Sequence, residues 1–174
     1  MVCQLRSARW SILYGPLDCS LYLLHRMQHP GRRVELLLIE DDPAAAQLTR
    51  DALSHCGMIS HVTVAVDEVQ AMQVLRQESP ARTRVRIPDA ILLSLSGTRC
   101  DGHDLLRKIK GDESLRRIPV LVLSGSDAAD DDLQRIYGSY ANCYIRKPAD
   151  PEQLEDVVRA IERFWFGIVI LPAR

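Results

Sequence analysis

One pattern occurs five times between residues 34 and 166: a short apolar run followed by a helix signal. The first run, Val34–Ile39, is almost continuously hydrophobic, as expected for a strand that is buried on both faces. Asp42 and Pro43 follow it, and an Asp cap with a Pro at the first helical position begins a helix. Strands that alternate with single helices favour a parallel sheet. The later runs are His61–Val66, Ala90–Leu95, Val120–Leu123 and Cys143–Ile145.

The helices between these runs carry their own signals. Asp67 and Asp150 repeat the cap seen at Asp42. The sequence therefore predicts an α/β protein with a doubly wound, five-stranded parallel sheet and helices on both faces. The helix after Asp67 has the apolar residues Val69, Met72 and Leu75, and the last helix carries the stripe Leu154, Val157, Val158, Ile161 and Trp165.

Charge divides the 174 residues into a basic leader and an acidic domain. Residues 1–33 hold five Arg and one Asp, and the remainder holds 17 basic and 22 acidic residues, for a net charge of −1. This balance argues against a dedicated nucleic-acid binder. The apolar stretch Trp10–Leu24 is interrupted by Gly, Pro and Asp and is too short to span a bilayer, so no membrane partner is expected.

The leader has two interpretations. It is either a short amphipathic anchor or partner arm, or it has no such role because it is disordered or is a start-site artefact with translation beginning at Met27, and the second is favoured. The five Cys are scattered and form no Cys-x-x-Cys pair, which excludes a zinc ribbon and argues against a disulfide scaffold. A reducing cytoplasm is the expected location.

Polar side chains follow the predicted strands. Glu40 and Asp41 follow the first strand, Ser94 lies at the third, Ser124 after the fourth and Lys147 after the fifth. In open α/β sheets, ligands bind beyond the carboxyl ends of the strands. Carboxylates, hydroxyls and an ammonium suit a phosphoryl group that is held through magnesium. The acids alone would fit a helix N-terminus equally well, but their coincidence with polar residues at other strand ends favours the phosphoryl site.

Four segments resemble the response-regulator receiver domain: IEDDP, DAILLSLSGTRCDG, VLVLSGS and CYIRKP. The resemblance covers about residues 34–166 and is closest to the small stand-alone receivers of bacterial phytochrome systems, through RRIPVLVLSGSDAADDD, IERFW and IVILP. It implies a flavodoxin-like (CheY-like) fold and a role in two-component phosphorelay signalling. It also implies no enzymatic activity and a sensor histidine kinase or other signalling protein as partner.

The resemblance also assigns roles by position. Glu40 and Asp41 match the metal-binding acid pair of the family. Ser124 matches the hydroxyl residue that contacts the phosphoryl group, and Lys147 matches the lysine that pairs with the phosphoryl group. Tyr144 matches the aromatic switch residue. The Lys147-Pro148 bond resembles a bond that is cis in the family.

Ser94 departs from the family, because an Asp at this position accepts the phosphoryl group from a kinase His. A carboxylate is already an ionised nucleophile at pH 7, whereas a serine hydroxyl needs a general base and gives a stable ester. The change removes a metal ligand, so we expect a weakened magnesium site, and it costs Lys147 a partner. Asp89, Asp101 and Asp104 offer no replacement acceptor. The prediction is a pseudo-receiver that acts through protein–protein interaction.

Several alternatives remain open. The chain is a drifted paralogue without a signalling role, or a serine kinase modifies Ser94, or the same topology carries a magnesium-dependent phosphatase. That phosphatase would need Asp-x-Asp, and Glu40 to Asp42 gives Glu-x-Asp. A flavodoxin-like cofactor binder is excluded, because acids after the first strand repel a phosphate.

An apolar tail, residues 167–174, follows the predicted domain. Together with Phe164, Trp165 and Phe166 it makes a dense hydrophobic end. The tail either folds back on its own core or forms a homodimer surface with the last helix, and the dimer is favoured.

Overall fold

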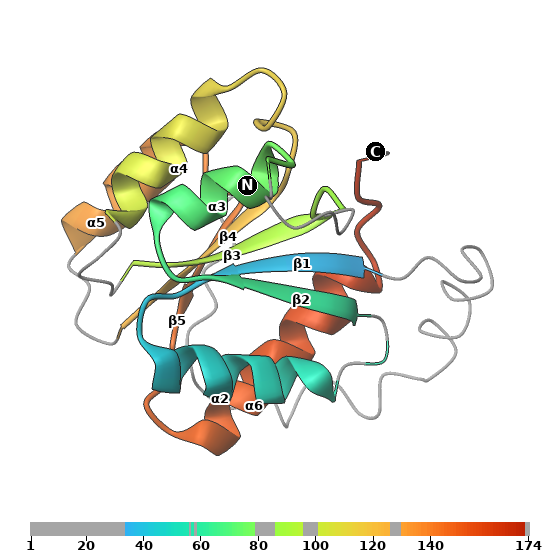
Figure 1. Ribbon diagram of the computed structural model, residues 1–174. Helices are drawn as coiled ribbons and strands as arrows, with labels where there is room; N and C mark the ends of the chain where they lie inside the picture. Colours follow the sequence, from blue (N-terminus) through green and yellow to red (C-terminus); the bar gives the residue numbers. More distant parts are fainter. Residues whose placement is uncertain are drawn as a thin grey trace.

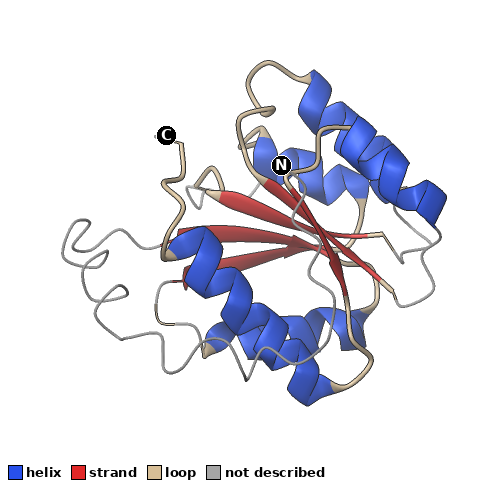
Figure 2. Cartoon of the chain, turned by 180° about the vertical axis from the view of Figure 1, so that it is seen from behind, coloured by secondary structure: helices blue, strands red, loops and turns tan. Residues whose placement is uncertain are grey.

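The computed structural model describes residues 34–55, 57, 59–78, 86–95, 101–125 and 130–172. Five strands form one parallel sheet in the order β2-β1-β3-β4-β5, with helices on both faces (Figures 1 and 2), so the predicted fold class is confirmed. The strands are β1 (Val34–Ile39), β2 (Ile59–Ala65), β3 (Ala90–Ser94), β4 (Val120–Ser124) and β5 (Cys143–Arg146). The helices are α2 (Pro43–Ser54), α3 (Glu68–Leu75), α4 (Gly102–Gly111), α5 (Asp130–Gly138) and α6 (Pro151–Ile161), and the π-helical segment η2 (Glu162–Phe166) continues α6.

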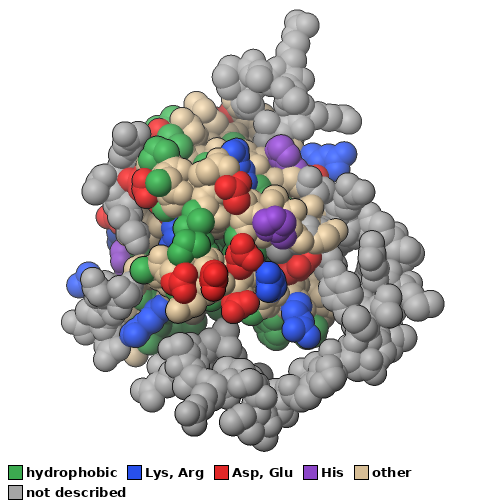
Figure 3. Space-filling model, turned by 90° about the horizontal axis from the view of Figure 1, so that it is seen from below, with side chains coloured by type: hydrophobic (Ala, Val, Ile, Leu, Met, Phe, Trp, Pro, Cys, Tyr) green, Lys and Arg blue, Asp and Glu red, His purple; other side chains and the backbone are tan. Residues whose placement is uncertain are grey.

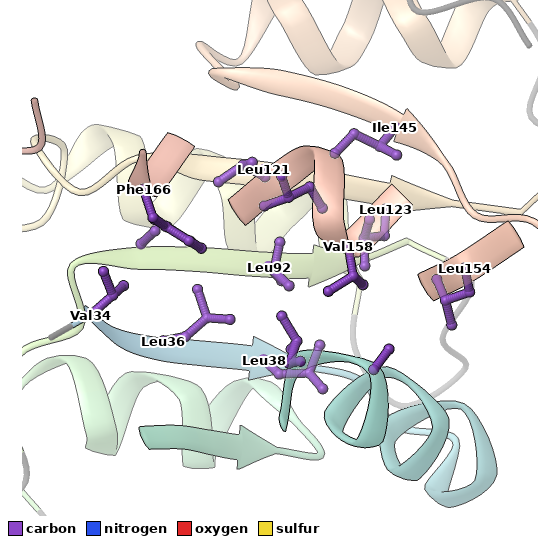
Figure 4. Close-up of a cluster of buried hydrophobic side chains, with 14 of the residues drawn as sticks. Val34, Leu36, Leu38, Leu92, Leu121, Leu123, Ile145, Leu154, Val158 and Phe166 are labelled. Carbon is purple, nitrogen blue, oxygen red and sulfur yellow. The ribbon is translucent and has the colours of Figure 1, made fainter. Parts of the chain in front are cut away.

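The sheet separates two hydrophobic layers. Side chains alternate between the faces of a strand, so Leu36 and Leu38 lie on one face of β1 and Leu37 and Ile39 on the other. The first face packs against α2 and α6, as the close-up of this layer shows (Figure 4), and the second packs against α3, α4 and α5. Both faces of the central strands are therefore buried, which explains their continuous apolar runs.

Acidic caps begin the helices where the sequence predicts them. The Asp42 carboxylate accepts hydrogen bonds from the Ala44 and Ala45 amides, and the Asp150 carboxylate accepts one from the Glu152 amide. Asp67 and Asp101 cap α3 and α4 in the same way. Each cap satisfies amide groups that a helix leaves unpaired at its N-terminus.

The end of α4 is joined to the sheet through Lys110. Its ammonium donates to the Ile118 carbonyl and to the Asn142 side-chain oxygen, each at 2.8 Å. The same Asn142 oxygen accepts from the Val120 amide at 2.9 Å. Burial lowers the pKa of Lys110 to about 8. This cluster fixes the beginnings of β4 and β5, at the edge of the sheet opposite the predicted site.

Two details of the helices differ from the sequence predictions. Val69 is exposed, because the buried stripe of the short helix α3 is Ala71 and Leu75, and Val69 lies about 200° around the helix from Ala71. The last α-helix ends at Ile161, and Trp165 lies in the π-helical turn η2 rather than on a continued α-helical stripe. The wider turn changes which side chains face the sheet.

The apolar tail divides between the core and the surface. Phe166 and Leu171 are buried in the hydrophobic layer between the sheet and helices α2 and α6. Trp165 and Val169 are partly buried and pack against this layer. Phe164, Ile168 and Ile170 are exposed. The tail thus folds back on its own core, as one of the two interpretations expected, and still presents an apolar outer side.

Some predictions fall outside the described residues. They include the leader 1–33, residues 79–85 of the basic loop, the loop 96–100 after β3 and residues 126–129 before α5. Among the described residues, no helix is both long and apolar enough to cross a membrane.

Gly102 allows α4 to begin close to the end of β3. A Cβ atom at this position would lie 2.7 Å from Leu95 Cδ2 and 3.1 Å from the Ser94 carbonyl oxygen. We expect Gly102→Ala to lower the free energy of unfolding by about 1–2 kcal/mol, because the start of α4 must move away from the sheet. Urea denaturation followed by circular dichroism measures the change.

Gly111, at the other end of α4, is the matched control. A Cβ atom there has no heavy atom within 4 Å, so Gly111→Ala should stabilise the protein by about 0.5–1 kcal/mol through helix propensity. Equal effects of the two substitutions would show that the close approach at Gly102 does not matter.

Candidate functional site

Glu40 and Ser94 lie side by side at the point where the strand order of the sheet reverses. The chain leaves β1 toward β2 on one side, and β3 lies on the other side, which is where open α/β sheets place their ligands. The register pairs Ile39 with Leu93, so the next residues on these two strands are Glu40 and Ser94. The Glu40 amide also donates to the Ala65 carbonyl of β2 at 3.0 Å.

The alternation of side chains sorts the predicted site residues into two groups. Residues two positions apart on a strand point to the same face of the sheet. The face that carries Leu38, Leu92 and Ile145 therefore continues with Glu40, Ser94 and Lys147. Ser124 continues the opposite face, which carries Val122, and Tyr144 packs against the layer on that side. Glu40, Ser94 and Lys147 therefore share one face at the carboxyl ends of the strands, and Ser124 and Tyr144 share the other.

Glu40 and Lys147 form a buried ion pair between β1 and β5. Lys147 Nζ lies 2.8 Å from Glu40 Oε2, and the two side chains are 14% and 3% exposed. The second oxygen, Oε1, accepts a 3.3 Å hydrogen bond from the Asp42 amide. The Lys147 amide donates to the Ser124 carbonyl at 2.7 Å, so the residue is held by its backbone as well. Lys147 thus keeps a strong partner, which its place in the sequence does not predict.

Ser94 is buried without a hydrogen-bond partner. The residue is 4% exposed, and its Oγ has no partner among the described residues. Buried hydroxyl groups are usually paired, because an unmade hydrogen bond costs free energy. The acid that the register puts next to this hydroxyl, Glu40, is held by Lys147 and by the Asp42 amide, so it is poorly placed to act as a base.

The hydroxyl and aromatic positions lie close to the sheet edge. Ser124 is buried, and its Oγ lies 3.5 Å from the Gly125 carbonyl, a long and weak contact. Tyr144 is half-buried and packs against the layer that contains Val122 and Ile136. Ser124 pairs with Arg146 in the register of β4 and β5, which puts Tyr144 and Ser124 on neighbouring strands.

The peptide bond between Lys147 and Pro148 is trans. There is no cis peptide bond among the described residues, so the cis bond that the resemblance implies is wrong for this structure. An X–Pro bond prefers trans by about 0.5–1 kcal/mol, and Lys147 reaches Glu40 with its bond in this form.

Asp89, Asp101 and Asp104 each have a hydrogen-bond or ion-pair partner of their own. The Asp89 carboxylate accepts from the Glu35 amide at 2.9 Å, at the beginning of β1 and therefore at the opposite end of the sheet. Asp101 caps α4. Asp104 is paired with Lys108 at 2.8 Å, and the hydrogen bond from Lys108 lowers the pKa of Asp104. That none of the three serves as a phosphoryl acceptor stays a prediction.

Asp42 is committed to the helix cap. Both of its carboxylate oxygens accept amide hydrogen bonds, and the residue is exposed. An acid in this arrangement is poorly placed for general acid catalysis on a phosphate ester, so the phosphatase alternative is not favoured.

The residues present fit a magnesium ion poorly. Mg²⁺ needs near-octahedral oxygen ligands, and the family resemblance places two carboxylates and a hydroxyl here. Glu40 already holds an ammonium on one oxygen and an amide on the other. In the part of the chain that the structure describes, no three His, Cys, Asp or Glu residues are grouped to hold a metal ion.

Comparison with known proteins agrees with this architecture. The model of the response regulator receiver domain matches residues 36–159. The "Probable methanogenesis regulatory protein FilR2" of Methanothrix harundinacea is 38% identical over 133 residues, 76% of this chain and 83% of the relative. Response regulator Rcp1 of Synechocystis is 35% identical over 138 residues, 79% of this chain and 92% of the relative.

Solved structures give the same result. The phosphorylated cyanobacterial phytochrome response regulator RcpA matches with a TM-score of 0.74 and 38% identity, over 81% of this chain and 99% of that one. The Mn²⁺-bound form of Rcp1 matches with a TM-score of 0.70 and 35% identity, over 80% and 99%. The chain therefore belongs to the response regulator receiver domain family.

Proposed function

We propose that this protein is a pseudo-receiver, which takes part in two-component signalling by binding a partner rather than by accepting a phosphoryl group. The observation that carries the proposal is Ser94, a buried hydroxyl at the position of the acceptor that has no hydrogen-bond partner among the described residues. A hydroxyl needs a base to become a nucleophile, and the neighbouring Glu40 is already held by Lys147. Glu40, Asp41, Ser124, Tyr144 and Lys147 form the rest of the proposed pocket.

The proposed partner is a sensor histidine kinase of the phytochrome type. Receiver domains interact with such kinases, and the relatives Rcp1 and RcpA are response regulators, the second of them named for a phytochrome. The non-enzymatic role and a cytoplasmic location are part of the same proposal. They are supported by the family match and by the scattered positions of the five cysteines in the sequence.

Residues 34–166 form the receiver in this proposal, with residues 1–33 as an extension before it and 167–174 as a tail after it. The family match at residues 36–159 supports the first boundary, and the packing of η2 on the sheet supports the second. A divalent cation is at most a weak ligand of the pocket, although the relative Rcp1 has a Mn²⁺-bound form.

Acetyl phosphate in the presence of Mg²⁺ tests the proposal directly. The purified wild type should gain no phosphoryl group by intact-mass spectrometry. Ser94→Asp should be labelled at least about tenfold above the wild type, because an ionised carboxylate replaces a hydroxyl that lacks an available base. Labelling of the wild type at any Asp would contradict the proposal.

Ser94→Asn is the matched control for this experiment. It has nearly the same shape as Ser94→Asp but no nucleophilic carboxylate, so it should stay unlabelled. Labelling of the Asn variant would show that the phosphoryl group enters at another position.

We also propose a homodimer that forms through η2 and the tail. Phe164, Ile168 and Ile170 are 52%, 67% and 76% exposed, and such neighbouring apolar side chains on a surface mark interaction sites. The face of α2 and α6 is less suitable. Acidic and basic side chains lie next to one another on it (Figure 3), and Arg159 is ion-paired with Glu155 and Asp156 of α6, so this face is polar rather than apolar.

Size-exclusion chromatography with light scattering tests the dimer. The wild type should elute with the mass of two chains, and the double variant Ile168→Asp/Ile170→Asp with the mass of one, because buried unpaired carboxylates oppose the contact. Val69→Asp on α3 alters a similarly exposed apolar side chain elsewhere and should leave the mass unchanged. A monomeric wild type at high concentration would refute the dimer.

A further inference from the structure

We propose that Arg116, Arg117 and Tyr140 form a second binding surface, at the beginnings of β4 and β5, which takes an acidic segment of a partner protein. The two arginines come just before β4 and the tyrosine just before β5, so the surface lies at the opposite end of the strands from Ser94. The proposal goes beyond the proposed function, because it does not depend on whether the pocket at Ser94 accepts a phosphoryl group.

Tyr140 combines an unusual backbone with a high exposure. Its φ angle is 62°, in the left-handed region that bulky residues rarely adopt and that favours Gly or Asn. The residue is 78% exposed, and within the described ranges its ring and hydroxyl make no hydrogen bond or ring contact. An exposed aromatic side chain on a strained backbone adds little to the stability of the fold, so its value lies in what it binds.

The turn that carries Tyr140 is held in place by other groups. The Tyr140 amide donates to the Tyr137 carbonyl at 3.0 Å, and the Asn142 amide donates to the Val120 carbonyl at 3.0 Å. The Asn142 side-chain oxygen accepts from the Val120 amide at 2.9 Å and from Lys110 Nζ at 2.8 Å. These bonds order the turn without the Tyr140 side chain, which is therefore presented from a fixed position.

Lys110 joins this turn to the segment that carries the two arginines. Its ammonium donates to the Arg116 carbonyl at 3.3 Å as well as to the Asn142 side-chain oxygen at 2.8 Å. The segment before β4 and the turn before β5 therefore meet at one nitrogen atom. Arg116, Arg117 and Tyr140 lie on these two segments, within two residues of the groups that Lys110 binds.

Both arginines are available to a partner. Arg116 and Arg117 are exposed, and among the described residues neither makes an ion pair. Arg107 and Arg159 differ, because each is ion-paired with an acid of its own helix. A guanidinium group without a carboxylate partner can bind one through two parallel hydrogen bonds. Arg and Tyr are also among the residues that contribute most to binding energy at protein interfaces.

The charges of the domain favour an acidic protein segment over a nucleic acid or an anionic membrane. Residues 34–174 hold 17 basic and 22 acidic side chains, and the exposed Glu113 lies in the same segment as Arg116 and Arg117. A long polyanion would meet this negative charge on either side of the surface. A short acidic segment needs only the two guanidinium groups and an apolar contact with the Tyr140 ring.

The experiment titrates the full chain with the synthetic peptide Glu-Glu-Leu-Glu-Glu-Leu and follows its amide NMR spectrum. The largest shifts should fall in residues 113–118 and 139–142. Arg116→Glu/Arg117→Glu should lower the affinity at least about tenfold, because like charges then face each other. A peptide with Gln in place of Glu should also bind at least about tenfold more weakly, and added salt should weaken the binding of the acidic peptide.

Tyr140→Asn tests the aromatic side chain separately from the fold. Asn adopts the left-handed backbone more readily than Tyr does, so the variant should keep the Tm of the wild type or exceed it. Its affinity for the acidic peptide should still fall by about fivefold or more, because the ring is lost. A lower Tm with unchanged affinity would assign Tyr140 to stability alone and overturn its place in the surface.

Arg50→Glu/Arg159→Glu is the matched control. It makes the same change of net charge at two exposed arginines of α2 and α6, so it should alter the affinity by about twofold or less. The proposal is overturned if this control weakens binding as much as Arg116→Glu/Arg117→Glu does. It is also overturned if the shifts fall elsewhere, or if the acidic peptide does not bind.

Two further probes test the class of partner. A single-stranded oligonucleotide and vesicles that contain phosphatidylserine should not bind through this surface. If either of them binds in place of the acidic peptide, and Arg116→Glu/Arg117→Glu abolishes that binding, the proposed partner is wrong. Labelling of the wild type by acetyl phosphate would refute the pseudo-receiver and leave this surface unaffected.

Discussion

The ion pair between Glu40 and Lys147 connects the segments that follow β1 and β5, at the carboxyl ends of the strands. It joins residues 107 positions apart in the chain, one after the second strand of the sheet order and one after the last. Its energy depends on the layers that exclude water from it, because exposed ion pairs contribute little. The helices α2 and α6 and the apolar strands therefore exclude water from these two charges.

The architecture was predictable from residues that strongly favour one kind of secondary structure. Val34–Ile39 is apolar at every position except Glu35, which suits a strand between two helical layers, and Asp42-Pro43 and Asp150-Pro151 are strong helix signals. The positions of Glu40, Ser94 and Lys147 at one edge followed from the parallel order alone. Local chemistry and topology agree at these residues, and this agreement made the prediction reliable.

Other features depend on contacts that no local pattern encodes. Lys147 was expected to lose a partner, but which carboxylate an ammonium meets depends on the register of three intervening strand pairs. Val69 looked like a core residue because Met72 and Leu75 follow it at helical spacing, although the short α3 buries only two side chains, Ala71 and Leu75. The π-turn after Ile161 leaves no clear mark in a sequence that continues with good helix residues.

That π-turn determines which side chains near the end of the chain face the core and which face outward. It holds about one residue more per turn than an α-helix, and it places Phe166 inward and Phe164 outward. Because each residue of an α-helix turns the next by about 100°, a single inserted or deleted residue in Glu162–Phe166 would rotate everything that follows. Related chains of slightly different length can thus present different outer side chains while the sheet and its pocket stay the same.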